Sequence, residues 1–177
     1  IGTNIGLLTV TNSGGATFAG TVDTTTGVTL SNTSGTIAFN DALTTPTLTT
    51  VARGYNLQLN GTSGTVTNAV TFLNTGTLKL GASGGTQIYT AGLTASGPSA
   101  ITLNGTIQSS SGAISLGSSD RVITLGSNVV IDSYADGGVG AAVSIAGSVQ
   151  ATSAGAQSLT LKAKSGSISI AGDVVYY

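Results

Sequence analysis

Short segments that alternate apolar and polar residues recur along the whole chain. Eleven three-residue segments begin and end with an apolar residue, and their middle residue is Thr, Ser, Gln or Lys in every segment except the one centred on Ala38. These segments cover residues 8–10, 28–30, 37–39, 57–59, 78–80, 101–103, 114–116, 123–125, 143–145, 159–161 and 168–170. Because side chains of a strand point alternately to its two faces, this period of two predicts strands that each bury one face.

Turn-forming residues separate these segments. Gly, Ser and Asn cluster at residues 12–15, 33–35, 83–85 and 135–138, and Gly and Asn tolerate the positive φ that tight turns require. No stretch repeats apolar residues at the three-and-four spacing of a helix, and β-branched residues dominate the apolar positions. The sequence therefore predicts an all-β protein.

The spacing of the segments indicates which all-β fold this is. The steps are 20 residues (Leu8 to Val28), 21 (Leu57 to Leu78), 23 (Leu78 to Ile101), 22 (Ile101 to Ile123) and 20 (Ile123 to Val143). A period of about 20–23 residues that contains several short strands is typical of a β-solenoid, whereas a β-sandwich shows no such fixed period. Dividing the chain by about 21 predicts roughly eight coils in one domain over residues 1–177.

A β-solenoid coil predicts which residues point into the core and which point to the outside. We expect Phe18, Phe39 and Phe72 to stack inward with Val, Ile and Leu, and Pro46 and Pro98 to lie at turns because proline cannot donate to a strand ladder. Thr and Ser are expected to line the outside as ladders. The Thr-x-Thr pairs that belong to this outer set are Thr9/Thr11, Thr24/Thr26, Thr47/Thr49, Thr65/Thr67 and Thr75/Thr77. Their steps of 15, 23, 18 and 10 residues are too irregular for one continuous ice-binding face.

Composition narrows the possible functions. The chain has 27 Gly, 30 Thr and 22 Ser, a net charge of −1, and no His, Cys or Glu. Nucleic acids and anionic membranes need a basic surface, and most catalytic or metal sites need the missing residue types. No apolar run reaches the length of a membrane-spanning helix. We therefore expect no enzymatic activity, no cofactor, no metal site and no nucleic-acid partner.

One acidic pair is the exception that we considered. Asp132 and Asp136 flank a flexible turn, and two carboxylates with backbone carbonyls are ligands that suit Ca²⁺. The same pair is the only candidate for the two carboxylates of glycoside hydrolysis. The interpretation that we favour is a solvated turn in which the Asp side chains cap local amides.

Other polar residues suggest weaker interactions. Exposed ion pairs between neighbouring coils are possible for Asp120 with Arg121, and within the group Lys162, Lys164 and Asp173. Three Asn residues match the N-glycosylation pattern, and we favour their role as turn residues over glycosylation. They are Asn32, Asn60 and Asn104.

Several segments of the repeat resemble a known protein family. Residues 35–40, 69–78, 101–107 and 157–161 are similar to the repetitive β-helical shaft of filamentous-haemagglutinin-like adhesins and giant bacterial surface proteins. The resemblance covers nearly the whole chain and supplies no catalytic residues. It implies a right-handed parallel β-helix, export to the bacterial cell surface, and a structural or adhesive role.

Both ends of the sequence stop inside strand-like patterns, at residues 5–8 and 174–177. An uncapped solenoid exposes unpaired backbone and core, which favours edge-to-edge association. We therefore expect a segment of a longer repetitive chain or a subunit that stacks end to end. The expected function is a stiff, low-charge rod in an extracellular filament, sheath or adhesin stalk. The alternative is a module that binds cell-surface carbohydrate or ice through a face rich in Thr, Ser and Asn.

Overall fold

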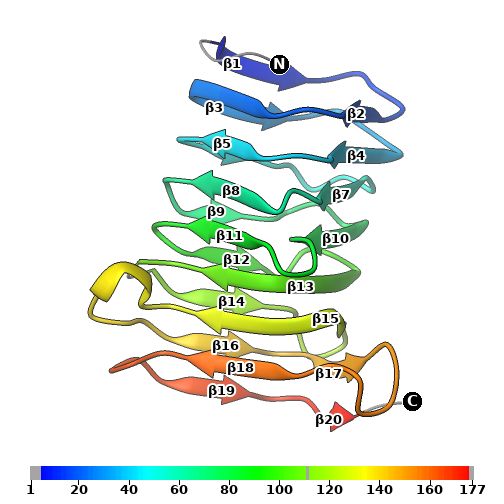
Figure 1. The fold of residues 1–177 in the computed structure, drawn as a ribbon. Coiled ribbons are helices and arrows are strands. Elements are labelled where there is room, and N and C mark those ends of the chain that lie inside the picture. The colour runs from blue at the N-terminus through cyan, green and yellow to red at the C-terminus, as the bar shows by residue number, and fades with distance from the viewer. Residues whose placement is uncertain (1–4, 111, 176–177) are drawn as a thin grey trace.

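The structure is a computed structural model that describes residues 5–110 and 112–175, without the side chain of Asp136. The chain winds as a parallel β-solenoid of about eight coils, which confirms the predicted fold class (Figure 1). Every pairing between the described strands is parallel. The single helical element described is the short 3-10 turn η1 (Ala135–Gly137). No described helix has the length and apolar character that crossing a membrane requires.

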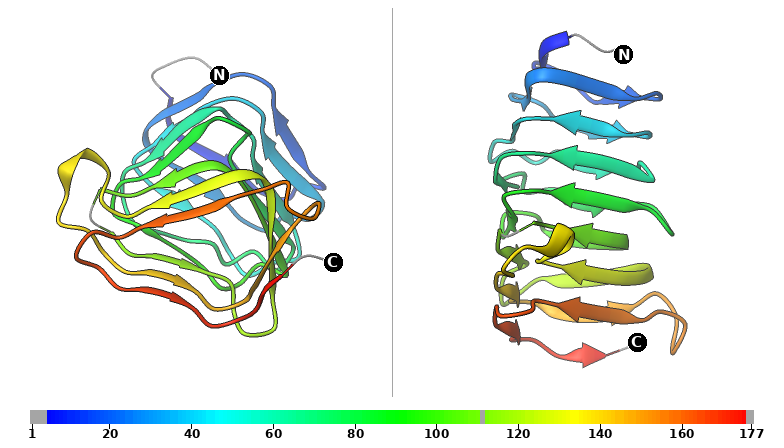
Figure 2. Two further views of the ribbon diagram at one scale, coloured as in Figure 1. Left: turned by 60° about the horizontal axis from the view of Figure 1, so that its bottom comes forward. Right: turned by 60° about the vertical axis from the view of Figure 1, so that its left-hand side comes forward.

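The strands form three faces that run along the rod (Figure 2). Face A contains β2 (Ala16–Phe18), β4 (Thr36–Phe39), β7 (Asn56–Leu59), β10 (Thr77–Leu80), the first parts of β13 (Ala100–Gln108) and β15 (Val122–Asp132), β17 (Ser148–Ala151) and β20 (Val174–Val175). Face B contains the first part of β3 (Val22–Leu30), β5 (Leu43–Thr45), β8 (Ser63–Val66), β11 (Thr86–Tyr89), the second parts of β13 and β15, and β18 (Leu159–Lys162). Face C contains the later parts of β1 (Ile5–Val10) and β3, then β6 (Leu48–Thr49), β9 (Val70–Thr71), β12 (Leu93–Ala95), β14 (Ile114–Leu116), β16 (Val143–Ile145) and β19 (Ile168–Ile170).

Apolar side chains fill the space between the three faces. All eleven alternating segments lie in strands, and equivalent residues of successive coils stack in register. Phe39 and Phe72 are fully buried, while half-buried Phe18 stacks on Phe39 with ring centroids 4.8 Å apart. The prediction that the three Phe residues point inward is therefore confirmed. Pro46 and Pro98 lie in turns, as predicted.

One predicted step of the repeat is wrong. Ile123 pairs with Val149 on face A, 26 residues later, whereas Val143 pairs with Ile114 on face C. The coil is longer than the others because the turn after β15 projects and includes η1 (Figure 1). A fixed period does not anticipate a lengthened turn, because turns can grow without disturbing the strands that pair.

The expected outward position of Thr24 is also wrong. Its side chain is buried, with 4% of its surface exposed, and it donates a hydrogen bond to the buried hydroxyl of Thr45 at 2.8 Å. Its Thr-x-Thr partner Thr26 is exposed, as expected. The pattern failed here because residues 24–26 bridge the bend of β3 between faces B and C, where the strict alternation of sides is interrupted.

Candidate functional site

The final coil presents core residues that nothing in the described structure covers. Ile168 of β19 and Val174 of β20 point inward but expose 48% and 64% of their surfaces. Their partners one coil earlier, Val143 and Val149, expose only 1% each. This surface, which we call the coil end, also includes the unpaired outer edges of β18, β19 and β20 within the described residues. It combines an apolar cross-section with free backbone N–H and C=O groups.

Face C carries a continuous row of hydroxyl side chains on its outer side. Direct strand register aligns most neighbours of this hydroxyl row, as in the pairs Thr94–Ser115 and Ser144–Ser169. The parts of the strands that form face C contain no charged residue. The members of the row are Thr9, Thr29, Thr49, Thr71, Thr94, Ser115, Ser144 and Ser169. Neighbouring strands lie about 4.8 Å apart, so the hydroxyls form a regular, uncharged line along the rod.

Sequence inspection did not find the hydroxyl row. Distance along the chain does not reveal the row, because each coil contributes one residue to it and the turns between these residues differ in length. Of the residues in the Thr-x-Thr pairs, only Thr9 and Thr49 belong to the row, and Thr65 lies on face B. The signal that identifies the row is strand register rather than spacing.

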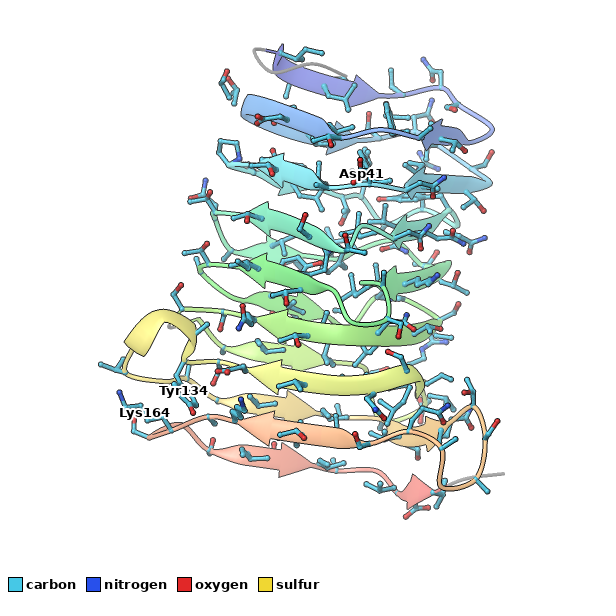
Figure 3. The ribbon with its side chains drawn as sticks, viewed as in Figure 1. Asp41, Tyr134 and Lys164 are labelled. Carbon is cyan, nitrogen blue, oxygen red and sulfur yellow. The ribbon has the colours of Figure 1, made fainter. Side chains whose placement is uncertain are left out.

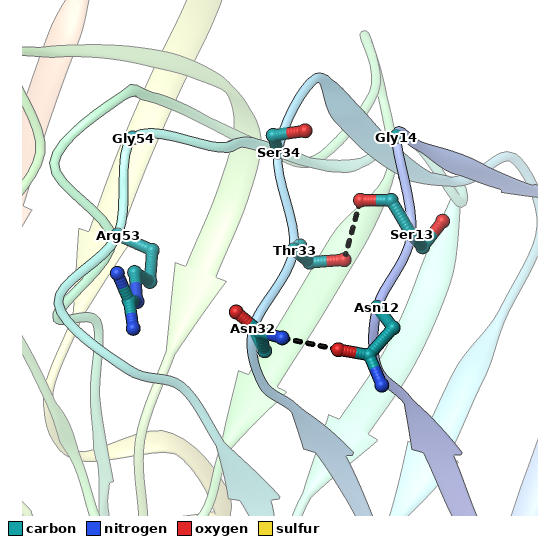
Figure 4. A pocket seen from close by; sticks show the side chains of 8 residues that line it. All are labelled: Asn12, Ser13, Gly14, Asn32, Thr33, Ser34, Arg53 and Gly54. Carbon is teal, nitrogen blue, oxygen red and sulfur yellow. Dashed lines mark hydrogen bonds between the residues drawn. The ribbon is translucent and has the colours of Figure 1, made fainter.

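A polar notch lies where the chain turns from face C to face A after β1, β3 and β6 (Figure 4). Asn12 and Asn32 occupy equivalent positions in the first two turns, and the Asn32 side-chain amide donates to the Asn12 side-chain oxygen. Both have positive φ, of 51° and 44°, a conformation that Asn tolerates. Arg53 lies in the third turn and its side chain is exposed. The notch has a volume of about 500 Å³ and is lined by Asn12, Ser13, Gly14, Asn32, Thr33, Ser34, Arg53 and Gly54.

The backbone around the notch is held by neighbouring turns. The Ser34 N–H donates to the Ser13 carbonyl at 2.8 Å, and the largely buried Thr33 hydroxyl donates to the same carbonyl at 3.2 Å. The Arg53 carbonyl accepts from the Thr75 N–H at 2.8 Å, while the Arg53 N–H donates to the Val51 carbonyl at 2.9 Å. The notch is therefore a fixed shape from which the Arg53 side chain extends.

Asp132 lies at the end of β15 and caps the turn that follows it. One carboxylate oxygen accepts from the Tyr134 N–H at 3.0 Å, and the other lies 3.8 Å from the Lys162 ammonium. The side chain of Asp136 lies outside the described part of the chain. Among the described residues, no group of three or more acidic, His or Cys side chains could hold a metal ion. The bond from Tyr134 is the amide capping that we favoured, but Asp132 is buried, with 7% of its surface exposed, rather than solvated.

The remaining charged residues near this turn have other partners than expected. Lys162 pairs with Asp132, and Lys164 donates to the Gly138 carbonyl at 2.9 Å, so neither forms the suggested pair with Asp173 in the described structure. Figure 3 shows Lys164 beside Tyr134 at the projecting turn, several coils from Asp41. Asp120 and Arg121 form no ion pair among the described residues, and the Ser119 hydroxyl donates to Asp120.

The three Asn residues that match the glycosylation pattern have different environments. Asn32 is exposed at the notch, and Asn60 donates to the Asn40 side chain at 2.9 Å. Asn104 is 8% exposed and lies inside β13, where the strand register shifts before Gly105. Asn104 therefore lies at a corner, as predicted, and β13 continues through this corner from face A to face B.

Comparison of the chain with protein-family models, with curated proteins and with solved structures found no match.

Proposed function

We propose that this chain is a structural β-solenoid module that associates end to end in an extracellular filament, sheath or adhesin stalk. Continuous parallel ladders along three faces favour a stiff rod, because each coil is hydrogen-bonded to the next along its strands. The absence of Cys from the sequence and its small number of charged residues are compatible with an inert extracellular material.

The coil end is the observation that carries this proposal, and the strand layer that covers it belongs to a second copy or to a neighbouring repeat of the same chain. Exposed edges and an exposed apolar cross-section favour pairing with another strand layer of the same outline. The opposite end of the rod offers such a layer, since β1 and β2 have one unpaired edge each within the described residues. In a stacked pair, β19 would continue face C into β1, and the hydroxyl row would pass from Ser169 to Thr9.

Electron microscopy with a matched pair of variants tests the proposal. Ile168→Asp places a charge in the exposed cross-section, whereas Ser169→Asp places it on the outer side of the same strand. We expect wild type and Ser169→Asp to form fibres with a meridional reflection near ~4.8 Å, and Ile168→Asp to remain monomeric with an unchanged circular dichroism spectrum. A monodisperse wild-type monomer at high concentration, or fibres of Ile168→Asp equal to those of wild type, would refute end-to-end stacking.

The hydroxyl row favours a second candidate function, the binding of ice or carbohydrate through face C. A regular and uncharged line of hydroxyls can hold ordered water or sugar hydroxyls, because each hydroxyl both donates and accepts. Thr49→Leu and Thr94→Leu interrupt the row, and Thr44→Leu on face B is the matched control. This function requires thermal hysteresis or glycan retention that the two row variants lose and the control keeps.

A further inference from the structure

We propose that the notch formed by Asn12, Asn32 and Arg53 binds an acidic saccharide. Arg53 holds the carboxylate of the sugar, and the two Asn side chains hydrogen-bond its hydroxyl groups. The structural role of the rod does not require this site, which is formed by the turns that follow β1, β3 and β6.

The exposed position of Arg53 and its lack of an ion pair among the described residues favour a ligand with a negative charge. Its guanidinium is exposed, and the single ion pair in the described part of the chain joins Lys162 to Asp132 instead. The nearest acids in sequence lie elsewhere on the rod: Asp23 is on β3 in face B, and Asp41 accepts from Thr21 at the turn before β5. A planar guanidinium offers parallel N–H donors that match both oxygens of a carboxylate. The charge and geometry at this site favour a carboxylate ligand.

The two Asn side chains favour a saccharide over a small inorganic anion. Their mutual hydrogen bond uses the Asn32 amide and the Asn12 oxygen, which leaves an acceptor on Asn32 and a donor on Asn12. Figure 4 shows the Asn32 oxygen on the side that faces Arg53. Sugar hydroxyls suit these two groups because each hydroxyl can donate and accept. Separate hydroxyls would meet them, since the free Asn12 nitrogen points away from Arg53 in Figure 4. The notch volume of about 500 Å³ falls in the range of about 300–1,000 Å³ that is usual for small-molecule sites.

Two glycines keep the notch open. A Cβ atom added at Gly14 or at Gly54 would meet no atom within 4 Å, so the space beside Asn12 and Arg53 is unfilled. Asn12 and Asn32 are held in the left-handed region by the paired turns around them. Little ordering is therefore needed when a ligand binds, apart from the Arg53 side chain, which favours affinity.

Calorimetry with two sugar probes tests the site. The probes are a short oligogalacturonate and the neutral oligogalactose of the same length, with inorganic phosphate as a competitor. Arg53→Gln removes the charge, Gly54→Leu fills the notch while keeping Arg53, and Arg121→Gln is the control at a distant turn. We expect the acidic probe to bind wild type, with affinity reduced about 10- to 100-fold in Arg53→Gln, which is the effect of losing one charge-assisted hydrogen-bonded pair.

Each outcome decides the proposal. Binding of the acidic probe that weakens in Arg53→Gln and Gly54→Leu but not in Arg121→Gln supports it, given unchanged circular dichroism spectra. Equal binding of the neutral probe, full competition by phosphate at the same concentration, unchanged binding in Arg53→Gln, or no binding to wild type overturns it. The notch begins in the turn between β1 and β2, the layer that would stack on the coil end. Binding is therefore measured in the Ile168→Asp background, which is expected to stay monomeric, so that loss of binding is not confused with fibre formation.

Discussion

Thr24 donates its hydroxyl hydrogen to the hydroxyl of Thr45 across 2.8 Å inside the rod, and Thr45 donates in turn to the Thr47 carbonyl at 2.9 Å. Thr45 pairs with Val66, and Val66 pairs with Tyr89, so the two Thr residues continue a row of inward side chains. A relay of hydrogen bonds thus takes the place of apolar stacking in two coils. Buried hydroxyls are tolerated here because each one finds an acceptor.

The direction of this relay predicts unequal effects of two matched substitutions. Thr45→Val leaves the buried Thr24 hydroxyl without its acceptor, which we expect to cost about 1–3 kcal/mol. Thr24→Val leaves Thr45 bonded to Thr47, so we expect a smaller loss, below about 1.5 kcal/mol. In the double variant the loss should be less than the sum of the two, because the residues interact directly. Urea unfolding of the four proteins measures the difference, and equal single effects would contradict the relay.

Much of the fold was predictable because its strands and the length of its coils each produce a short-range pattern in the sequence. The alternation around Leu57, Leu78 and Ile101 reflects strands with one buried face, and their spacing reflects the length of a coil. The burial of Thr24 and the long coil after Ile123 were not predictable in the same way. The first depends on a bend within one strand and the second on the length of a turn, and neither changes the alternation of neighbouring segments.

Turn glycines provide a second prediction. Gly35 has a φ of +67° and its added Cβ would lie 2.0 Å from the Gly14 carbonyl oxygen, whereas an added Cβ at Gly54 would meet nothing within 4 Å. We expect Gly35→Ala to cost more than about 2 kcal/mol, because left-handed strain of about 1–2 kcal/mol adds to a direct overlap with the coil above. Gly54→Ala should change the melting temperature little. Similar thermal unfolding of both variants would show that the turn at Gly35 can open.

The hydroxyl row and the notch were harder to predict from the sequence than the core was. The hydroxyl row and the notch each unite residues about one coil apart, such as Asn12 and Asn32, whose proximity depends on strand register. The preceding turns have no positively charged residue at the place of Arg53, because Ser13 and Thr33 occupy the corresponding region there. A repeat analysis averages over such a residue and therefore does not identify it.

A third prediction concerns the turn capped by Asp132. Asp132→Ala removes the acceptor of the Tyr134 N–H as well as the partner of Lys162, and we expect a loss of about 1–2 kcal/mol. Lys162→Met removes only an ion pair whose Lys side chain is 45% exposed, so the loss should stay below about 1 kcal/mol. Thermal unfolding with and without a chelator completes the test. A melting temperature that falls on chelation would instead indicate a bound cation at this turn.

The last prediction concerns alkaline stability. Burial raises the pKa of Tyr89 from its ordinary value of 10.0, and its hydroxyl has no hydrogen-bond partner among the described residues. Burial also raises the pKa of Tyr55, and the Val51 backbone and the Thr50 hydroxyl lower it by less. Above pH about 10 the unfolded chain releases these protons while the folded chain keeps them. The free energy of unfolding should therefore fall by about 1.4 kcal/mol per pH unit for Tyr89, and the raised pKa of Tyr55 should steepen the fall.

Removing the hydroxyl separates this effect from other alkaline damage. Tyr89→Phe should raise stability by about 1–3 kcal/mol at neutral pH, because it removes an unpaired buried polar group. It should also reduce the slope above pH about 10 by about 1.4 kcal/mol per unit, and adding Tyr55→Phe should reduce it further. Tyr134→Phe, at the half-exposed position before η1, is the control. Urea unfolding across this pH range gives the slopes, and a slope for Tyr89→Phe equal to that of wild type would show that Tyr89 ionises within the folded rod.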